Sequence, residues 1–243
     1  MKILILGGTG EARELAGRLV EQGHEVVTSL AGRTSAPQLP AGELRVGKFG
    51  GVPGLVGYLR ARRFDRLVDA THPYAGLISH NAVAAAAQTG VALVRYMRPA
   101  WNEPRDGNWT HVPDVAFAAA ALPSGASVLV TTGHEGLDEL LVRDDCDLVV
   151  RLLEPPDAPL PRHATLVLGH PPYRLEDEIK LMQREEITYL VTKNSGGEQT
   201  AAKLEAAAQL GAAVIMIDRP ALPPAVETAT IEETLAALHV ADS

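Results

Sequence analysis

Residues 3–12 read ILILGGTGEA, a short aliphatic run that leads into a turn with three glycines. Residues 3–6 predict a buried β-strand, because four consecutive aliphatic side chains suit a strand that is covered on both faces. Residues 10–22 predict an amphipathic helix, since apolar side chains recur on one face and charged side chains on the other. A strand, a glycine-rich turn and a helix in this order indicate the start of a βαβ unit.

The turn between this strand and this helix is a candidate phosphate-binding site. Glycines there let a phosphate reach the backbone N–H groups at the start of the helix. The spacing differs from G-x-G-x-x-G because Arg13 stands at the third position after Gly10. A tight turn without a ligand is the alternative interpretation. The candidate cofactor-binding residues of the turn are Gly7, Gly8, Thr9, Gly10, Glu11 and Ala12.

The alternation of short apolar runs and helical segments continues along the chain. In the first half, strands are expected at 25–30, 44–46, 66–69 and 91–96, and helices at 52–63 and 74–89. The pattern stops at 98–108, which contains two prolines and a glycine. It then restarts, with strands expected at 128–130, 148–153, 166–168, 188–192 and 213–217, and helices at 175–184, 198–210 and 231–239.

These patterns predict an α/β protein of two Rossmann-like domains, each with a parallel sheet, and a cleft between them. The expected domains are residues 1–98, which bind the dinucleotide, and residues 99–243, which bind the substrate. The last helix, at 231–239, either packs on the second domain or returns to the first.

The end of the second strand indicates which dinucleotide is bound. A ribose without a 2′-phosphate usually meets Asp or Glu about 20 residues after the glycines. Here the chain has Ser29 instead, with Arg33 just beyond it. A hydroxyl and a guanidinium suit a 2′-phosphate, which favours NADP over NAD. The alternative is that Arg33 is a solvated loop cation.

A polar loop, DATHPYA, follows the fourth strand at residues 69–75. Ligands of open α/β sheets bind at the carboxyl ends of parallel strands, where this loop lies. Thr71 is expected to cap a helix that starts with Pro73 in its first turn. His72 and Tyr74 are expected to present a hydrogen-bond donor and an acid–base group, and a purely structural histidine is the alternative.

Two loops of the second half carry similar patterns. Residues 193–197 read KNSGG and residues 131–134 read TTGH, each after a predicted strand. Consecutive N–H groups at a glycine-rich helix start, next to a lysine, form an anion site. An ordinary helix cap at Ser195 is the alternative. The candidate substrate-binding residues are Thr132, Gly133, Lys193, Asn194, Ser195, Gly196 and Gly197.

Composition excludes several classes of protein. The formal net charge of −8 argues against a general nucleic-acid coat, whose surface would be basic. The single cysteine, Cys146, rules out an intrachain disulfide and fits a reducing cytoplasm. No apolar run reaches the ~20 residues that a membrane span needs. The histidines lack compact ligand spacing, so no catalytic metal is expected.

Taken together, the motifs resemble the precorrin-6A reductase family of cobalamin biosynthesis. The resemblance is carried in chain order by residues 3–12, 69–75, 131–133, 190–197 and 216–220. It departs from the family at residues 169–173, GHPPY, where Gly-Pro-Phe or Gly-Pro-Tyr is common. The resemblance implies a reductase that transfers a hydride from NADPH to a double bond of the precorrin-6A macrocycle, giving precorrin-6B.

The implied substrate is a tetrapyrrole polycarboxylate, which an acidic protein must meet with local cations. The candidates are Lys193, Arg95, Arg98 and Arg219, each at or just past a predicted strand end. Tyr74 and His72 are the candidate catalytic proton donors, with solvent as the alternative. No nucleic-acid or membrane partner is expected, and the protein is expected to be a monomer or a weak homo-oligomer.

Other functions remain open at this point. The family also includes cobalt-precorrin-6A reductases, and these motifs do not separate the two substrates. A different NADP-dependent oxidoreductase would act on a smaller acid. A non-enzyme alternative is a dinucleotide sensor or corrinoid carrier, which would bind the dinucleotide without consuming hydride.

Overall fold

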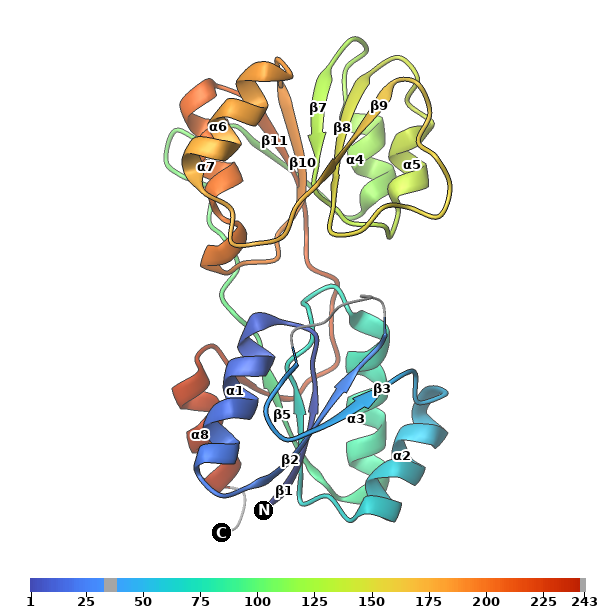
Figure 1. Ribbon diagram of the computed structural model, residues 1–243, viewed down its shortest axis with the longest axis vertical. Helices are drawn as coiled ribbons and strands as arrows, with labels where there is room; N and C mark the ends of the chain where they lie inside the picture. Colours follow the sequence, from blue (N-terminus) through green and yellow to red (C-terminus); the bar gives the residue numbers. More distant parts are fainter. Residues whose placement is uncertain (33–38, 241–243) are drawn as a thin grey trace. The chain divides into compact units, whose positions relative to one another are not determined.

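The computed structural model describes residues 1–32 and 39–240. The chain forms two compact units, and each contains a six-stranded parallel sheet with helices on both faces (Figure 1). Two Rossmann-like α/β domains are therefore confirmed. The first unit comprises Met1–Pro99 and the C-terminal segment that starts at Pro220, and the second unit is Ala100–Arg219.

The sheet of the first unit has the order β12-β5-β4-β1-β2-β3, and every pair of neighbours is parallel. Its strands are β1 (Lys2–Leu6), β2 (Glu25–Leu30), β3 (Glu43–Val46), β4 (Arg66–Asp69), β5 (Ala92–Tyr96) and β12 (Val226–Thr228). Its helices are α1 (Gly10–Glu21), α2 (Gly51–Arg62), α3 (Gly76–Thr89) and α8 (Ile231–Val240).

Strand β1 lies in the middle of this sheet and contributes side chains to two separate cores. Ile3 and Ile5 pack with α1 and α8, whereas Leu4 and Leu6 pack with α2 and α3. All four are at most 2% exposed. Each buried aliphatic side chain stabilises the fold by about 1.5–3 kcal/mol. The aliphatic run of the sequence thus forms the central strand because both of its faces are covered.

The C-terminal segment returns to the first unit. Strand β12 pairs with β5, and α8 packs beside α1 (Figure 1). The backbone oxygen of Leu238 in α8 accepts a hydrogen bond of 3.1 Å from Nε of the buried Arg66. The last helix therefore returns to the first unit, which was one of the two expected alternatives, and the second unit ends at Arg219 instead of at residue 243.

The sheet of the second unit has the order β6-β11-β10-β7-β8-β9 and is also parallel throughout. Its strands are β6 (Trp109–Val112), β7 (Ser127–Val130), β8 (Asp147–Leu152), β9 (Ala164–Leu168), β10 (Tyr189–Lys193) and β11 (Ala213–Ile217). Its helices are α4 (Val115–Ala121), α5 (Leu137–Leu141), α6 (Leu175–Arg184), the 3₁₀ turn η1 (Glu198–Thr200) and α7 (Ala202–Leu210).

Each sheet has one point where the direction of strand succession reverses. In the first unit it lies between β1 and β4, and in the second unit between β7 and β10. Open α/β sheets bind ligands outside the carboxyl ends of the strands at such a point. The four loops that the sequence singles out follow β1, β4, β7 and β10. They therefore flank the two switch points.

Within residues 1–32 and 39–240, no helix is long and apolar enough to cross a membrane. Over the same ranges, no three His, Cys, Asp or Glu side chains gather into a group that could hold a metal ion.

Candidate functional site

The turn after β1 has the geometry of a phosphate cradle. A Cβ at Gly7 would lie 2.9 Å from Cγ2 of Thr28, and Gly8 has a φ of +116°. Thr9 caps α1, because its Oγ1 accepts a hydrogen bond of 3.0 Å from N of Ala12. Gly10 and Glu11 come before Ala12 in the first turn of α1. Their N–H groups have no acceptor within the helix, because the first N–H groups of any helix lack one. This is the arrangement that an anion needs.

The same turn is tied to its two neighbouring strands. Thr9 Oγ1 donates to the backbone oxygen of Ala70, just after β4, over 3.0 Å. N of Gly7 donates to the backbone oxygen of Ser29, at the end of β2, over 3.0 Å. The glycine turn therefore lies beside both the candidate loop 69–75 and the strand end that was predicted to meet the ribose.

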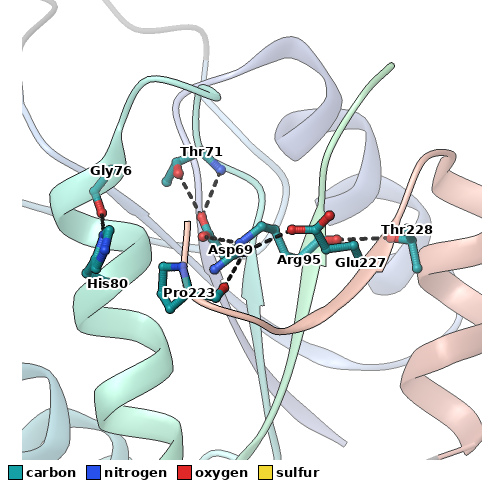
Figure 2. A network of polar contacts seen from close by, with 8 residues as sticks. All are labelled: Asp69, Thr71, Gly76, His80, Arg95, Pro223, Glu227 and Thr228. Carbon is teal, nitrogen blue, oxygen red and sulfur yellow. Dashed lines mark hydrogen bonds and ion pairs between the residues drawn. The ribbon is translucent and has the colours of Figure 1, made fainter. Parts of the chain in front are cut away.

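Asp69 determines the conformation of the loop after β4. Its carboxylate is 1% exposed, and its Oδ1 accepts hydrogen bonds from N and Oγ1 of Thr71, over 3.3 and 2.7 Å (Figure 2). The prediction that Thr71 caps the next helix is wrong. Helix α3 begins at Gly76 with Ala75 in the N-cap position, because the Thr71 hydroxyl is bonded to Asp69 instead.

His72 and Tyr74 lie together in this loop. Their ring centroids are 5.7 Å apart, and N of Tyr74 donates to Nδ1 of His72 over 3.3 Å. Because Nδ1 accepts that bond, a neutral imidazole carries its proton on Nε2. His72 is exposed, Tyr74 is half-buried and Pro73 is buried between them. The loop thus presents two groups that can hold a proton.

Arg95 lies below this loop, in the network that Figure 2 shows. Its side chain is 1% exposed; Nε is 3.3 Å from Oδ2 of Asp69, and Nη1 donates to O of Pro223 and Oε1 of Glu227, each over 2.9 Å. The prediction that Arg95 contacts the substrate is wrong, because β4 and β5 are adjacent and bury it against Asp69. Arg95 instead links the loop after β4 to the C-terminal segment.

Arg98 has a partner at the glycine turn. Its Nη1 lies 2.8 Å from Oε1 of Glu11, in the first turn of α1. Burial raises the pKa of the neighbouring Tyr96, and the negative charge of Glu11 raises it further. The ion pair offsets the carboxylate of Glu11, which would otherwise repel an anion at this helix start. A small pocket beside it is lined by Thr9, Thr71, Pro73, Tyr96 and Arg98.

In the second unit, Asn194 holds the backbone of Trp101. Its Oδ1 accepts from N of Trp101 over 2.8 Å, and its Nδ2 donates to O of Trp101 over 3.1 Å. Its backbone oxygen accepts from Nε of Arg219 over 2.8 Å. The indole Nε1 of Trp101 donates to O of Gly197 over 3.1 Å. The amide of Asn194 therefore shapes the loop after β10.

The remaining predicted substrate residues lie at the switch point of the second sheet. Lys193 ends β10, Ser195 is 8% exposed, and Gly196 and Gly197 both have a positive φ, which favours glycine. Across the switch point, Thr132 is buried and follows β7. Gly133 beside it also has a positive φ. The two glycine-bearing loops thus flank one end of one sheet, as parallel strands require.

The loop that departs from the family pattern is anchored by two charged residues that the sequence analysis did not select. Arg151 of β8 forms a buried ion pair with Glu178 of α6, and its guanidinium carbon lies 4.0 Å above the ring of Tyr173. Burial raises the pKa of Tyr173. The only sequence feature that could have indicated this ion pair is an arginine inside the otherwise apolar strand predicted at 148–153. N of Tyr173 donates to O of Gln199 over 3.0 Å, which joins this loop to η1.

Ser29, the residue before the last of β2, is buried and accepts a hydrogen bond from Arg45 of β3. Arg33, the predicted cation for the 2′-phosphate, lies outside the described residues. Arg45 was not among the predicted site residues, because nothing in its local sequence pattern places it beside Ser29.

Comparisons with known proteins identify the relatives of this chain. Residues 2–239 match the family described as precorrin-6x reductase CbiJ/CobK. A precorrin-6A reductase of Rhodococcus erythropolis is 49% identical, over 93% of this chain and 92% of that protein. One of Rhodobacter capsulatus is 46% identical, over 95% and 93%. A solved structure of CobK precorrin-6A reductase matches with a TM-score of 0.94 and 44% identity, covering 99% of this chain and 96% of that one.

Proposed function

Because this chain belongs to the precorrin-6x reductase CbiJ/CobK family, we propose that it reduces precorrin-6A with NADPH as the hydride donor. The reduction of precorrin-6A in cobalamin biosynthesis is the activity of the relatives that it matches at 41–49% identity over nearly its whole length. The chain is an oxidoreductase, and a reductase of this family uses a nicotinamide cofactor. We propose in addition that the cofactor is NADPH, and we propose which residues form the site and what each of them does.

The first unit carries the proposed dinucleotide site. The observation that carries the proposal is the glycine turn at the switch point, where Gly7 leaves no room for a Cβ and Thr9 caps α1. The turn of residues 7–12 would hold the pyrophosphate through backbone N–H groups such as those of Gly10 and Glu11, and residues 71–74 would contact the cofactor from the other side of the switch point. When bound, the nicotinamide supplies the hydride.

The preference for NADPH rests on the end of β2. Ser29 stands near the place where NAD-dependent folds have Asp or Glu, so the described residues there contribute no carboxylate that would repel a 2′-phosphate. Ser29 and Arg33 are the proposed contacts of that phosphate.

His72 and Tyr74 are the proposed proton donors. Reduction of a double bond adds a hydride to one atom and a proton to the other. The Nδ1 bond from N of Tyr74 directs the proton of a neutral His72 to Nε2, and the phenol of Tyr74 lies beside that ring. The phenol of Tyr74 can give its proton directly, whereas His72 acts as an acid only as the imidazolium, in which Nδ1 no longer accepts the bond from N of Tyr74.

The second unit carries the proposed site for the polycarboxylate substrate. Lys193 supplies a positive charge, and Gly196 and Gly197 supply backbone N–H groups at the start of η1. Ser195 is the proposed contact between them, and its own N donates to O of Lys193 over 2.7 Å. Thr132 and Gly133 lie across the switch point. Asn194 acts through Trp101, by fixing the loop that holds these groups.

We also propose that the enzyme acts in the cytoplasm as a monomer or a weak homo-oligomer. Its only cysteine, Cys146, is a buried thiol, which fits a reducing compartment. Its partner is then the small-molecule substrate alone, since a net charge of −8 disfavours nucleic acid.

The test follows the loss of nicotinamide absorbance after precorrin-6A is added to enzyme and NADPH. At saturating NADPH, which allows for their role as cofactor contacts, the double variant Tyr74→Phe and His72→Ala should lose kcat by roughly 100-fold or more, as expected for a lost general acid. Near-normal turnover by the double variant would show that the proton comes from elsewhere. Equal use of NADH by the wild type would refute the cofactor choice.

A further inference from the structure

We infer that Arg45 determines the specificity for NADPH, by positioning Ser29 and by placing a fixed positive charge beside the 2′-phosphate. This inference rests on the proposed function, because it concerns the cofactor named there. Arg45 lies in β3, outside the glycine turn and outside the loop after β2 that the sequence indicated.

Hydrogen bonds connect Arg45 to the glycine turn through one residue, Ser29. Arg45 is the register partner of Ser29 in the β2–β3 pair, and its Nη1 donates to Oγ of Ser29 over 3.2 Å. The backbone oxygen of Ser29 accepts from N of Gly7 over 3.0 Å. In dinucleotide-binding sheets the adenosine ribose lies at the end of the second strand, next to this turn. The guanidinium is therefore close to the expected ribose.

The side chain of Arg45 is held in place before any ligand arrives. Nη1 also donates to O of Gly47, and Nη2 donates to O of Lys48 over 3.0 Å. The guanidinium carbon lies 3.7 Å above the ring of Phe49 and 5.2 Å from that of Tyr58. A planar cation fixed by stacking and hydrogen bonds loses little conformational entropy on binding a phosphate.

Arg45 differs from Arg95, Arg98 and Arg151 in the groups that its guanidinium contacts. Arg95, Arg98 and Arg151 each pair with a carboxylate. Within the described residues, the oxygens bonded to Arg45 belong to neutral groups, a hydroxyl and two carbonyls, so its positive charge is not cancelled there. A phosphate dianion is the ligand that such a site attracts most strongly.

The hydroxyl of Ser29 is oriented so that it can also bind the 2′-phosphate. This hydroxyl is buried and accepts from Arg45, so its own proton is directed away from the guanidinium. A serine with this geometry donates to an oxygen acceptor such as a phosphate. Arg45 is thus a positioning residue for Ser29 and an electrostatic partner of the phosphate.

The experiment is calorimetric titration with two fragments that differ only in the 2′-phosphate, 2′,5′-ADP and 5′-AMP. The wild type should prefer 2′,5′-ADP. Arg45→Gln should reduce the ratio of the two affinities roughly tenfold or more, as expected for a lost charge-assisted contact. Arg45→Lys keeps the charge without the planar fork and should reduce the ratio about threefold.

Arg60→Gln is the matched control, because it removes one positive charge from the exposed surface of α2 in the same unit. It should leave the ratio unchanged, and thermal unfolding should show that every variant is folded. A purely structural role, bracing residues 47–49, would lower stability without altering the ratio.

The outcomes separate this inference from the proposed function. A wild type that binds both fragments equally refutes the choice of NADPH, and the role of Arg45 falls with it. A wild type that prefers 2′,5′-ADP, with an unchanged ratio in Arg45→Gln, overturns the role of Arg45 alone. If Arg45→Gln does not fold, an unchanged ratio in folded Arg45→Lys overturns it equally.

Discussion

Both units contain a buried ion pair between an arginine and a carboxylate beside a functional loop, but the two pairs are built differently. In the first unit, Asp69 and Arg95 come from adjacent strands, and each is 1% exposed. In the second unit, Arg151 comes from a strand and Glu178 from a helix. The first pair therefore joins strands and loops at the switch point, whereas the second joins a helix to its sheet.

The surroundings of the two pairs differ as well. Asp69 accepts from Thr71, and Arg95 donates to the C-terminal segment, so this pair connects three parts of the chain. Arg151 stacks on Tyr173, while Oε2 of Glu178 has no hydrogen-bond partner within the described residues. Nη2 of Arg95 is also unpartnered there. The first pair therefore supports more of the structure near its site than the second pair does.

The largest expected effect follows from breaking the first pair. Asp69→Ala leaves Arg95 buried without its strand neighbour and removes the acceptor of Thr71, so unfolding free energy should fall by about 3–5 kcal/mol. Urea denaturation measures it. Glu43→Ala is the control, because Glu43 is paired with Arg62 on the surface and should lose no more than about 1 kcal/mol. Equal losses in the two variants would contradict the role given to Asp69.

A smaller effect is expected in the second unit. Glu178→Gln keeps the shape of the side chain and one acceptor for Arg151, but it removes the charge. Arg151 also keeps its stacking on Tyr173, so the loss should be about 1–3 kcal/mol by the same denaturation. A loss larger than that of Asp69→Ala would reverse the comparison.

The smallest expected effect is on the pH dependence of stability, and it comes from His24 near the amino terminus of the first unit. Burial lowers the pKa of His24, and the positive N-terminus and His239 lower it further. The unfolded chain therefore binds more protons than the folded one as the pH falls below the ordinary histidine pKa of about 6.5. Stability should decrease from pH 7 toward the lowered pKa, and His24→Gln should flatten this slope in denaturation curves. An unchanged slope would exclude His24 as its source.

Local patterns predicted the central elements and the loops at both switch points. The aliphatic run 3–6 and the glycines after it are contiguous in the sequence, so they identify a strand and its turn directly. The neighbouring central strands are long enough for their apolar pattern to be recognised. The edge strands β6 and β12 were missed because they are short and polar; β12 has one aliphatic residue, Val226, in three positions. Helices α4 and α5 were missed because they have only seven and five residues.

The contacts that shape the site could not be predicted in the same way. Asp69 meets Arg95, and Ser29 meets Arg45, only because particular strands are neighbours in the sheet. Thr71 looked like a helix cap, but Asp69 two residues earlier competes for its hydroxyl. The expected helix 198–210 divides into η1 and α7, where the loop after β10 is held by Trp101.

A crystal structure of the complex with NADP⁺ tests the central claim most directly. The pyrophosphate should lie against the glycine turn of residues 7–12 in the first unit, beside the N–H groups of Gly10 and Glu11, with the 2′-phosphate beside Ser29 and Arg45. A dinucleotide seated instead on residues 193–197 of the second unit would contradict the account.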